Sequence, residues 1–189
     1  MRPAAFLDRD GVLLRLVQDA HDGYRGARSL SEVELIDGVV PAVRTLAAAG
    51  YACVVVTNQP DLARGKQTAA QLSAVHRYLR AALPLTAVYS CWHDTVSGCR
   101  CRKPLPGMLV AAAARHRLDL GRSVMFGDRH SDLRAARAAG CAFCWITADA
   151  QDSQPSEHTG TRAGTLYDAV RALLAGRLRP ADVNRGVDD

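Results

Sequence analysis

The stretch AFLDRDGVLL, residues 5–14, runs from three apolar residues directly into Asp8 and Asp10 and then becomes apolar again. A short apolar run of this kind is typical of a strand that is buried on both faces, where charge is costly. Two acids one residue apart repel each other, so one tends to stay protonated unless a cation lies between them. The stretch therefore predicts a buried strand, and the rest of the chain decides whether the acids at its end hold a cation.

The rest of the chain alternates between β-like and helix-like segments. Five short apolar runs predict buried strands, at residues 3–8, 51–57, 86–91, 123–127 and 141–147. Between them, apolar residues three and four apart predict helices, at residues 39–50, 68–83, 106–118 and 131–140. Such alternation predicts parallel βαβ units, and hence a three-layer, Rossmann-like α/β fold. A polar surface loop is expected over residues 148–164, followed by a helix over 166–176 that packs on the sheet.

Length and composition favour one globular domain. The chain has 189 residues, of which 48% are hydrophobic and 23% are charged, and this balance is ordinary for a soluble protein. We expect a single domain over residues 1–175 and a flexible tail over 176–189. No apolar run approaches the ~20 residues that span a bilayer, and the first residues do not resemble a secretory signal. We therefore expect a cytoplasmic protein with no membrane partner, as a monomer or a weak homo-oligomer.

The charge of the chain is positive, and arginine dominates it. The formal net charge is +5, and 22 of the 24 basic residues are arginine. Because these arginines are scattered along helical segments, a solvated surface explains them better than a nucleic-acid face does. A zinc-containing nucleic-acid-binding module remains an alternative, and it predicts salt-sensitive binding that survives Asp8→Asn. We expect no nucleic-acid partner, because that alternative leaves the acidic strand ends unexplained.

Four strand ends bring polar residues to one edge of the predicted sheet. In order along the chain they supply Asp8 and Asp10, Thr57 and Asn58, Arg102 and Lys103, and Gly127 and Asp128. Ligands of open parallel sheets bind at this edge, beyond the carboxyl ends of the strands. Two acids alone are often turn residues or helix caps, but four converging motifs indicate a site.

The residue types at this edge fit phosphoryl transfer. Asp8 and Asp128 are suitable ligands for Mg²⁺, which is usually held by one or two carboxylates, waters and substrate phosphate. With that ion and Lys103 on the phosphoryl oxygens, Asp8 becomes a usable nucleophile that forms an aspartyl-phosphate. Asp10 is placed to protonate the leaving oxygen and then to deprotonate water. Thr57 and Asn58 offer further hydrogen-bond donors to the phosphoryl oxygens.

A second cluster, from Cys91 to Cys101, predicts structural zinc. It holds Cys91, His93, Cys99 and Cys101 within eleven residues, a Cys₃His set that closes a tetrahedral site. The alternative is unpaired thiols in a reducing cell. Because Arg102 and Lys103 directly follow the last of these residues, we expect zinc to set their position. The other pair, Cys141 and Cys144, lies in an apolar run and is expected to pack in the core.

Four segments of the chain resemble the motifs of the haloacid dehalogenase superfamily. They are FLDRDGV, VVVTNQPDLARGKQT, CRCRKPLPGM and FGDRHSD, and the branch they resemble contains heptose bisphosphate phosphatases and histidinol phosphatases. The resemblance implies Mg²⁺ bound by Asp8, the backbone carbonyl of Asp10 and Asp128. It also implies phosphoryl stabilisation by Thr57 and Lys103, substrate recognition by Arg102 and a zinc loop.

The same resemblance indicates a substrate class. The segment between Asp10 and the first helix is too short for a large cap domain, so loops would select the substrate. HDGYRG and ARGK resemble the heptose enzymes, which implies hydrolysis of D-glycero-D-manno-heptose 1,7-bisphosphate at C7, with histidinol phosphate as the alternative substrate. The expected substrate-binding residues are Asp22, Gly23, Tyr24, Asn58, Gln59, Arg64, Arg102 and Arg129. The chain departs from the usual pattern at Pro60, Asp61 and Arg129 and in the length of the segment 15–31.

Overall fold

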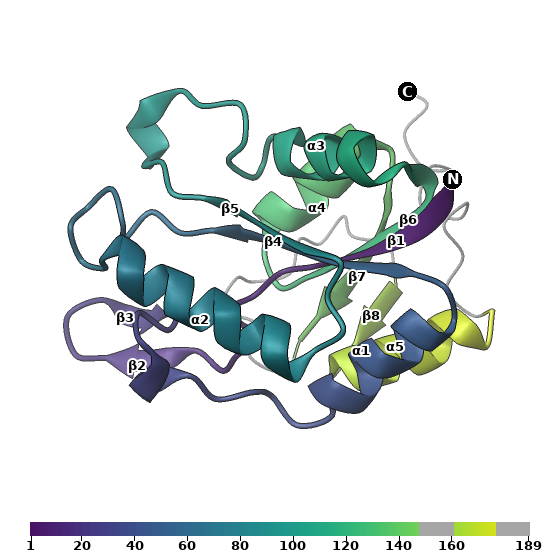
Figure 1. Ribbon diagram of the computed structural model, residues 1–189, viewed down its shortest axis with the longest axis horizontal. Coiled ribbons are helices and arrows are strands. Elements are labelled where there is room, and N and C mark those ends of the chain that lie inside the picture. Colours follow the sequence, from purple (N-terminus) through teal and green to yellow (C-terminus); the bar gives the residue numbers. More distant parts are fainter. Residues whose placement is uncertain (148–160, 177–189) are drawn as a thin grey trace.

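A computed structural model describes residues 1–147 and 161–176 of the chain. The described strands form a six-stranded parallel sheet in the order β5-β4-β1-β6-β7-β8, with a separate two-stranded hairpin (Figure 1). The sheet strands are β1 Arg2–Leu7, β4 Ala52–Asn58, β5 Ala87–Cys91, β6 Leu118–Gly127, β7 Ala142–Ile146 and β8 Thr161–Ala163. Within the described residues, no helix has the length and apolar character needed to cross a membrane.

Helices cover both faces of the sheet, as the predicted three-layer fold requires. One apolar cluster joins the sheet to α1 Val39–Ala48, α2 Ala69–Ala82 and α5 Leu166–Leu174. A second cluster lies on the opposite face under α3 Gly107–His116 and α4 His130–Ala139 (Figure 1). The central strands are therefore buried on both sides, which explains why their sequences are continuously apolar. The predicted packing of the last helix near the sheet is confirmed by its contacts with β7 and β8.

The first buried strand ends where the sequence predicts. Residues 4–7 of β1 are fully buried and pair in parallel with β4 on one side and β6 on the other. Gly11 then turns the chain with a φ of 82°, a left-handed conformation that favours glycine. A side chain at Gly11 would collide with the carboxylate of Asp128, so this glycine also lets the first loop approach the acid that follows the neighbouring strand β6.

Three short strands were not expected from the sequence. A hairpin forms from β2 Val17–Asp19 and β3 Gly23–Arg25, and β8 lies within the stretch expected to be a surface loop. The loop prediction is therefore wrong for residues 161–163, while 148–160 lie outside the described residues. Each of these strands has three residues, too few for a period of two to become visible. The expected tail also lies outside the description from residue 177 onward.

The segment between Asp10 and α1 contains the hairpin and the short 3₁₀ helix η1 Leu30–Glu32. It carries no large cap domain, as predicted, and η1 contacts α2. Loops and the hairpin therefore form the walls of any site at the carboxyl ends of the strands.

Candidate active site

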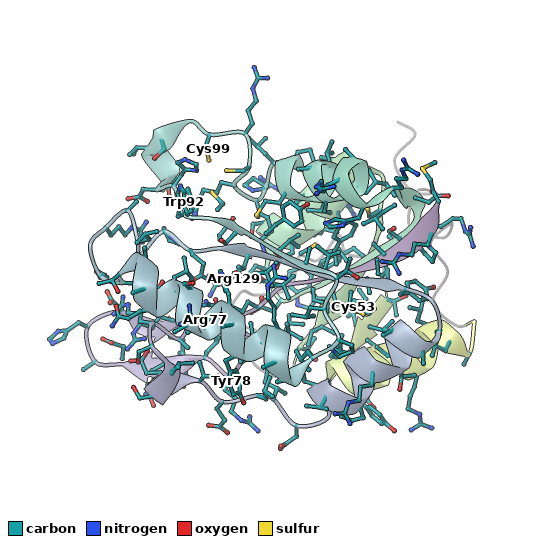
Figure 2. The ribbon with its side chains drawn as sticks, viewed as in Figure 1. Cys53, Arg77, Tyr78, Trp92, Cys99 and Arg129 are labelled. Atoms are coloured by element: carbon teal, nitrogen blue, oxygen red, sulfur yellow. The ribbon has the colours of Figure 1, made fainter. Side chains whose placement is uncertain are left out.

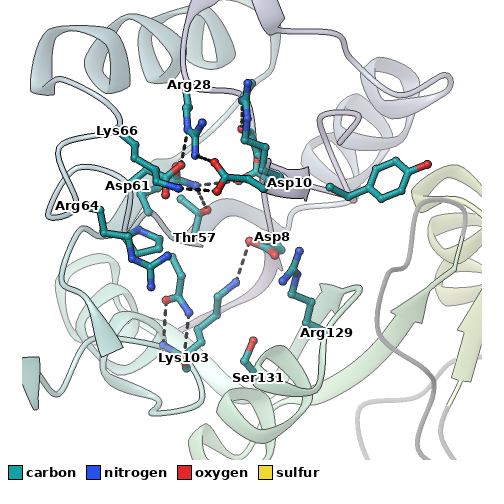
Figure 3. A pocket seen from close by; sticks show the side chains of 18 of the residues that line it. Asp8, Asp10, Arg28, Thr57, Asp61, Arg64, Lys66, Lys103, Arg129 and Ser131 are labelled. Carbon is teal, nitrogen blue, oxygen red and sulfur yellow. Dashed lines mark hydrogen bonds and ion pairs between the residues drawn. The ribbon is translucent and has the colours of Figure 1, made fainter. Parts of the chain in front are cut away.

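A polar pocket of about 350 Å³ opens at the carboxyl ends of the central strands (Figure 3). Most of the expected residues line it, namely Asp8, Asp10, Asp22, Tyr24, Thr57, Asn58, Gln59, Arg64, Arg102, Lys103 and Arg129. Gly23 begins β3, directly after the hairpin turn, and is not among the lining residues, and Asp128 is completely buried beside the pocket. The topology therefore brings four distant sequence segments into one cavity.

Three buried carboxylates form the floor of the site. Asp8, Asp128 and Asp132 each offer an oxygen, and these oxygens lie within 4.8 Å of one another. Both oxygens of Asp128 are buried without a hydrogen-bond partner. Burial and, to a smaller extent, the neighbouring charges of Asp8 and Asp132 together raise the pKa of Asp128 to about 8. Orphaned oxygens at this spacing fit a hard divalent cation, whose charge would lower these pKa values again.

Lys103 supplies positive charge at the same point. Its Nζ lies 2.8 Å from Oδ1 of Asp8 and 2.6 Å from Oδ1 of Asp132, and it donates to the carbonyl of Val56 at 2.9 Å. Figure 3 shows this side chain extended toward Asp8, with Arg129 on the other side of Asp8 in that view. Burial by itself lowers the pKa of Lys103, but the two carboxylates outweigh it and raise the pKa above its usual value.

The pKa of Asp8 reflects opposing influences. Burial raises it most, Lys103 lowers it, and the nearby Asp132 raises it, with a net value of about 6. Asp8 also accepts a hydrogen bond of 2.7 Å from the backbone N–H of Arg9, which favours its charged form. Lys103 and the backbone N–H of Arg9 therefore favour the charged form of Asp8, against the effect of its burial.

Asp132 was not singled out from the sequence, although it belongs to the quoted motif FGDRHSD. It lies in the first turn of α4, is fully buried and accepts from the backbone N–H of Arg129 at 3.1 Å. The sequence did offer one signal for Asp132, because it is an acid four residues after Asp128, in the first turn of a helix that follows the strand. Such a carboxylate is favoured there by the unsatisfied N–H groups of the helix terminus.

Asp10 lies at the other side of the site, bound by neutral and charged donors. Arg9 Nε lies 2.9 and 3.0 Å from its two carboxylate oxygens. Gln59 Nε2 donates to Asp10 Oδ2 and to Thr57 Oγ1, each at 2.8 Å. Arg9 is fully buried, which sequence reasoning missed because an arginine in a turn is usually exposed.

Ion pairs connect the hairpin to the loop after β4 at the rim of the pocket. Oδ2 of Asp22 lies 2.7 Å from Nη2 of Arg28, and Oδ1 of Asp22 lies 2.5 Å from Nζ of Lys66. Nε of Arg28 lies 2.6 Å from Oδ2 of Asp61. The hydrogen bonds from Lys66 and Arg28 lower the pKa of Asp22. Asp61, one of the departures noted in the sequence, thus helps to hold the two walls together.

Three arginines of the pocket were expected to bind substrate, and they differ in whether a carboxylate already pairs with them. Arg64 pairs with Asp94 at 2.6 Å. Arg102 and Arg129 form no ion pair with any carboxylate in the described part of the chain, and Arg102 Nη1 donates only to the carbonyl of His93 at 3.4 Å. These two guanidinium groups are therefore available to an anion that enters the pocket.

The predicted cysteine cluster is assembled in the structure. The ligand atoms of Cys91, His93, Cys99 and Cys101 lie within 4.8 Å of one another. The separations of Cys101 Sγ from Cys91 Sγ and His93 Nδ1 are 3.4 and 3.3 Å, and the loop carrying Cys99 lies well apart from Cys53 (Figure 2). Sulfur and nitrogen atoms this close are compatible with tetrahedral zinc, whose ligands lie ~2.0–2.3 Å from the metal.

The other predicted cysteines pack as expected. Cys141 and Cys144 are buried, and burial raises the pKa of each thiol to about 12. His130, which follows Asp128 closely in the sequence, packs edge-on against Trp145 at a centroid distance of 5.3 Å. These residues therefore belong to the core and its edge rather than to the pocket.

Comparisons with known proteins agree with this geometry. A family model described as HAD-hydrolase-like matches residues 100–173. The D-glycero-beta-D-manno-heptose-1,7-bisphosphate 7-phosphatase of Salmonella typhi is 40% identical over 149 residues, covering 72% of this chain and 76% of that protein. The D-glycero-D-manno-heptose-1,7-bisphosphate 7-phosphatase of Thermosynechococcus vestitus is 42% identical over 156 residues, covering 74% and 76%.

Solved structures extend the similarity over nearly the whole chain. The D,D-heptose 1,7-bisphosphate phosphatase of Bordetella bronchiseptica, complexed with magnesium and phosphate, superimposes with a TM-score of 0.77 at 33% identity. That superposition covers 93% of this chain and 99% of the other. A putative HAD-like phosphatase from Mesorhizobium loti superimposes with a TM-score of 0.71 at 29% identity, covering 92% of this chain and 87% of the other.

Proposed function

The chain belongs to the haloacid dehalogenase-like phosphatases, and from that premise we propose that it hydrolyses the 7-phosphate of D-glycero-D-manno-heptose 1,7-bisphosphate. The observation that carries the proposal is the pocket in which Lys103 and three buried carboxylates meet, in a chain whose relatives are heptose bisphosphate phosphatases. It is an enzyme of the phosphoric monoester hydrolase class.

Magnesium is the proposed catalytic cofactor. Asp8, Asp128 and the backbone carbonyl of Asp10 would hold it, because the oxygens of Asp128 are buried without partners and those of Asp8 lie within reach. When bound, the ion neutralises charge on the phosphoryl oxygens and orients them for in-line displacement. The Bordetella bronchiseptica structure contains magnesium and phosphate together, which supports this assignment.

Lys103 lets an anionic nucleophile receive an anionic substrate. A phosphate charge ~4 Å from a carboxylate costs roughly 4 kcal/mol at an effective dielectric of ~20. Lys103 Nζ, at 2.8 Å from Asp8, offsets part of this repulsion and can contact the phosphoryl oxygens together with the Thr57 hydroxyl. Asp8 then attacks phosphorus, the bond to the sugar oxygen breaks, and the phosphoryl group rests on the Asp8 carboxylate.

Asp10 is the proposed proton carrier in both steps. It gives a proton to the sugar oxygen as that oxygen leaves, and it then takes a proton from the water that attacks the aspartyl-phosphate. The water oxygen enters the phosphate, and Asp8 is restored. Gln59, which bridges Asp10 and Thr57, keeps the acid and the phosphoryl-binding hydroxyl in a fixed relation.

Substrate recognition is assigned to the open part of the pocket. Arg102 and Arg129 are the cations free to bind sugar phosphate oxygens, with Asn58, Gln59 and Tyr24 nearby as hydrogen-bonding groups. Asp22 and Arg64 act at the rim, where their ion pairs shape the walls, and Gly23 allows the hairpin turn that carries Asp22. We propose a single catalytic domain over residues 1–175, active as a monomer or weak homo-oligomer in the cytoplasm.

Structural zinc is proposed for Cys91, His93, Cys99 and Cys101. Three thiols and an imidazole would saturate a tetrahedral ion and leave no position for a water nucleophile. Arg102 bonds to the carbonyl of His93, and Asn58 bonds to both the backbone N–H and carbonyl of Lys103. The loop therefore connects the zinc ligands to the two cations of the active site.

The test is phosphate release by the purified protein with Mg²⁺. Heptose 1,7-bisphosphate, other phosphorylated sugars and histidinol phosphate are compared with an Asp8→Asn control. We expect heptose bisphosphate to have the highest kcat/KM and the Asp8→Asn protein to be inactive. Faster phosphate release from histidinol phosphate would contradict the proposed substrate and favour histidinol phosphate instead. Phosphate release no faster than that of the Asp8→Asn protein would contradict the proposal that the protein is a phosphatase.

A further inference from the structure

Gly26, directly after β3, lies against the carboxylate of Asp10. A Cβ atom at Gly26 would lie 2.5 Å from Cγ, 2.6 Å from Oδ2 and 2.7 Å from Oδ1 of Asp10, closer than real Cβ contacts occur. The φ of Gly26 is outside the left-handed region. Lack of space, rather than backbone conformation, therefore excludes a side chain at this position.

The Asp10 carboxylate cannot move aside without losing its partners. Arg9 Nε contacts both of its oxygens, and Gln59 Nε2 donates to Oδ2. Any group that displaced the carboxylate would have to break these bonds in a largely buried site, where each lost bond to a charged group is costly.

Ala27, the residue after Gly26, accepts a hydrogen bond from Arg9, which in turn binds Asp10. Arg9 is fully buried, and its Nη2 donates to the carbonyl of Ala27 at 3.0 Å. The hairpin itself is fixed, because Arg25 lies 2.8 Å from both Asp19 and Glu32. Consecutive residues of one segment thus contact Asp10 directly and through Arg9.

We propose that Gly26 and Ala27 form a positioning element for the acid and base of the reaction. The element fixes the Asp10 carboxylate relative to Asp8, and it couples the hairpin wall of the pocket to proton transfer. This inference rests on the proposed function, because it takes the role of Asp10 from it.

Displacing Asp10 has different consequences for substrates with different leaving groups. A sugar alkoxide needs the proton of Asp10 in order to leave, so the first step slows. Nitrophenolate leaves from 4-nitrophenyl phosphate without a proton, so only the second step, in which Asp10 deprotonates water, slows. The aspartyl-phosphate then accumulates with this substrate.

Gly26→Ala tests the inference, with Gly121→Ala as its matched control. A Cβ at Gly121 would meet only Asp119, at 3.6 Å, an ordinary contact. Circular dichroism and thermal unfolding establish that both variants fold. For Gly26→Ala we expect kcat with heptose bisphosphate to fall by ~10²-fold, in the range of general acid–base catalysis, and KM to change little. With 4-nitrophenyl phosphate we expect a burst of nitrophenolate equal to the enzyme concentration, and Gly121→Ala should behave as the unmodified protein.

A folded Gly26→Ala protein with unchanged kcat would overturn the inference. Slower turnover without a burst would also overturn it, because it would mean that the nucleophile rather than Asp10 is disturbed. If Gly26→Ala does not fold, Arg9→Lys replaces it as the test. Lysine cannot donate hydrogen bonds to the Ala27 carbonyl and to both Asp10 oxygens at the same time. The same burst is expected, and its absence refutes the inference. Failure of the proposed function differs, because the unmodified protein itself would then release no phosphate.

Discussion

The Nζ atom of Lys103 lies 2.8 Å from Oδ1 of Asp8, and both side chains are buried. The proposed nucleophile and the cation are thus paired before substrate arrives, although they lie more than ninety residues apart in sequence. Because the pair is preformed, little reorganisation is needed when charge moves onto the phosphoryl oxygens.

Replacing Lys103 with methionine should remove most activity while conserving side-chain volume. The substitution leaves Asp8 and Asp132 without their shared cation, so we expect kcat to fall ~10³-fold. Removing one partner of a buried ion pair costs about 3 kcal/mol, so thermal unfolding in metal-free buffer should shift downward. Phosphate release and calorimetry measure the two effects.

Lys66→Met is the control for that substitution. Lys66 is partly exposed at the rim and pairs with Asp22, so its loss should change kcat by less than about tenfold. Equal losses of kcat in the two variants would show that Lys103 contributes only to the overall charge of the pocket.

Asp132→Asn should weaken magnesium binding. The variant keeps the side-chain shape but loses a negative charge beside Asp8 and Asp128, and it loosens the hold on Lys103. Groups that support metal ligands typically contribute 10–100-fold in affinity, so we expect the Kd for Mg²⁺ to rise by at least about tenfold. Isothermal titration of the metal measures it, and an unchanged Kd would exclude Asp132 from the metal site.

The sequence was sufficient to predict five of the six described sheet strands and the polar edge of the sheet. Continuous apolar runs marked the central strands, and Asp8 and Asp128 followed them at positions that parallel topology brings together. Asp132 was missed although an acid in the first turn of the helix was a local signal, because its burial beside Lys103 is a contact between distant segments. The hairpin was missed because its strands are too short to show a period.

Contacts at the rim were also beyond sequence reasoning. Asp22 was predicted to bind substrate, yet the structure pairs it with Arg28 and Lys66, and its role toward substrate stays a prediction. The burial of Arg9 depends on the carbonyl of Ala27, which approaches only when the hairpin folds back. Such partners are fixed by tertiary packing, whereas strand ends are fixed by local patterning.

Cys101→Ser should release zinc and reduce activity. Zinc binding by such ligand sets is worth ~10 kcal/mol or more, so loss of one thiolate should loosen the loop that carries Arg102 and Lys103. We expect less than one zinc per chain by elemental analysis and a clear fall in kcat/KM with Mg²⁺ present. A folded, zinc-free variant with full activity would refute the link between the loop and the catalytic cations.

Cys141→Ser is the control for Cys101→Ser, because it replaces a cysteine that is not a proposed zinc ligand. Cys141 is buried directly before β7 and remote in sequence from the proposed zinc ligands, so its substitution should leave the zinc content unchanged. Any loss of stability in this variant comes from placing a hydroxyl in an apolar core.

His76 should make the protein less stable in mild acid. Burial, with a smaller contribution from Arg9, lowers the pKa of His76 to about 4. An unfolded histidine titrates near ~6.5, so between these values the unfolded state binds the extra proton, and stability falls as pH falls. Because the ring is partly exposed, we expect the free energy of unfolding to fall by only roughly 1–2 kcal/mol over this pH range.

His76→Gln isolates that contribution, because glutamine does not titrate. Urea unfolding at about pH 7 and about pH 5 should show a smaller stability difference in the variant than in the unmodified protein. An identical pH dependence in both proteins would mean that His76 is protonated equally in the folded and unfolded states.

Trapping of the phosphorylated enzyme tests the central claim most directly. The protein is mixed with Mg²⁺ and heptose bisphosphate, quenched in acid during turnover and reduced with borohydride, which converts an aspartyl-phosphate to homoserine. Peptide mass spectrometry should find homoserine at position 8 and none in the Asp8→Asn protein. Phosphate release by the unmodified protein with no homoserine at position 8, or with homoserine at another aspartate, would contradict the account.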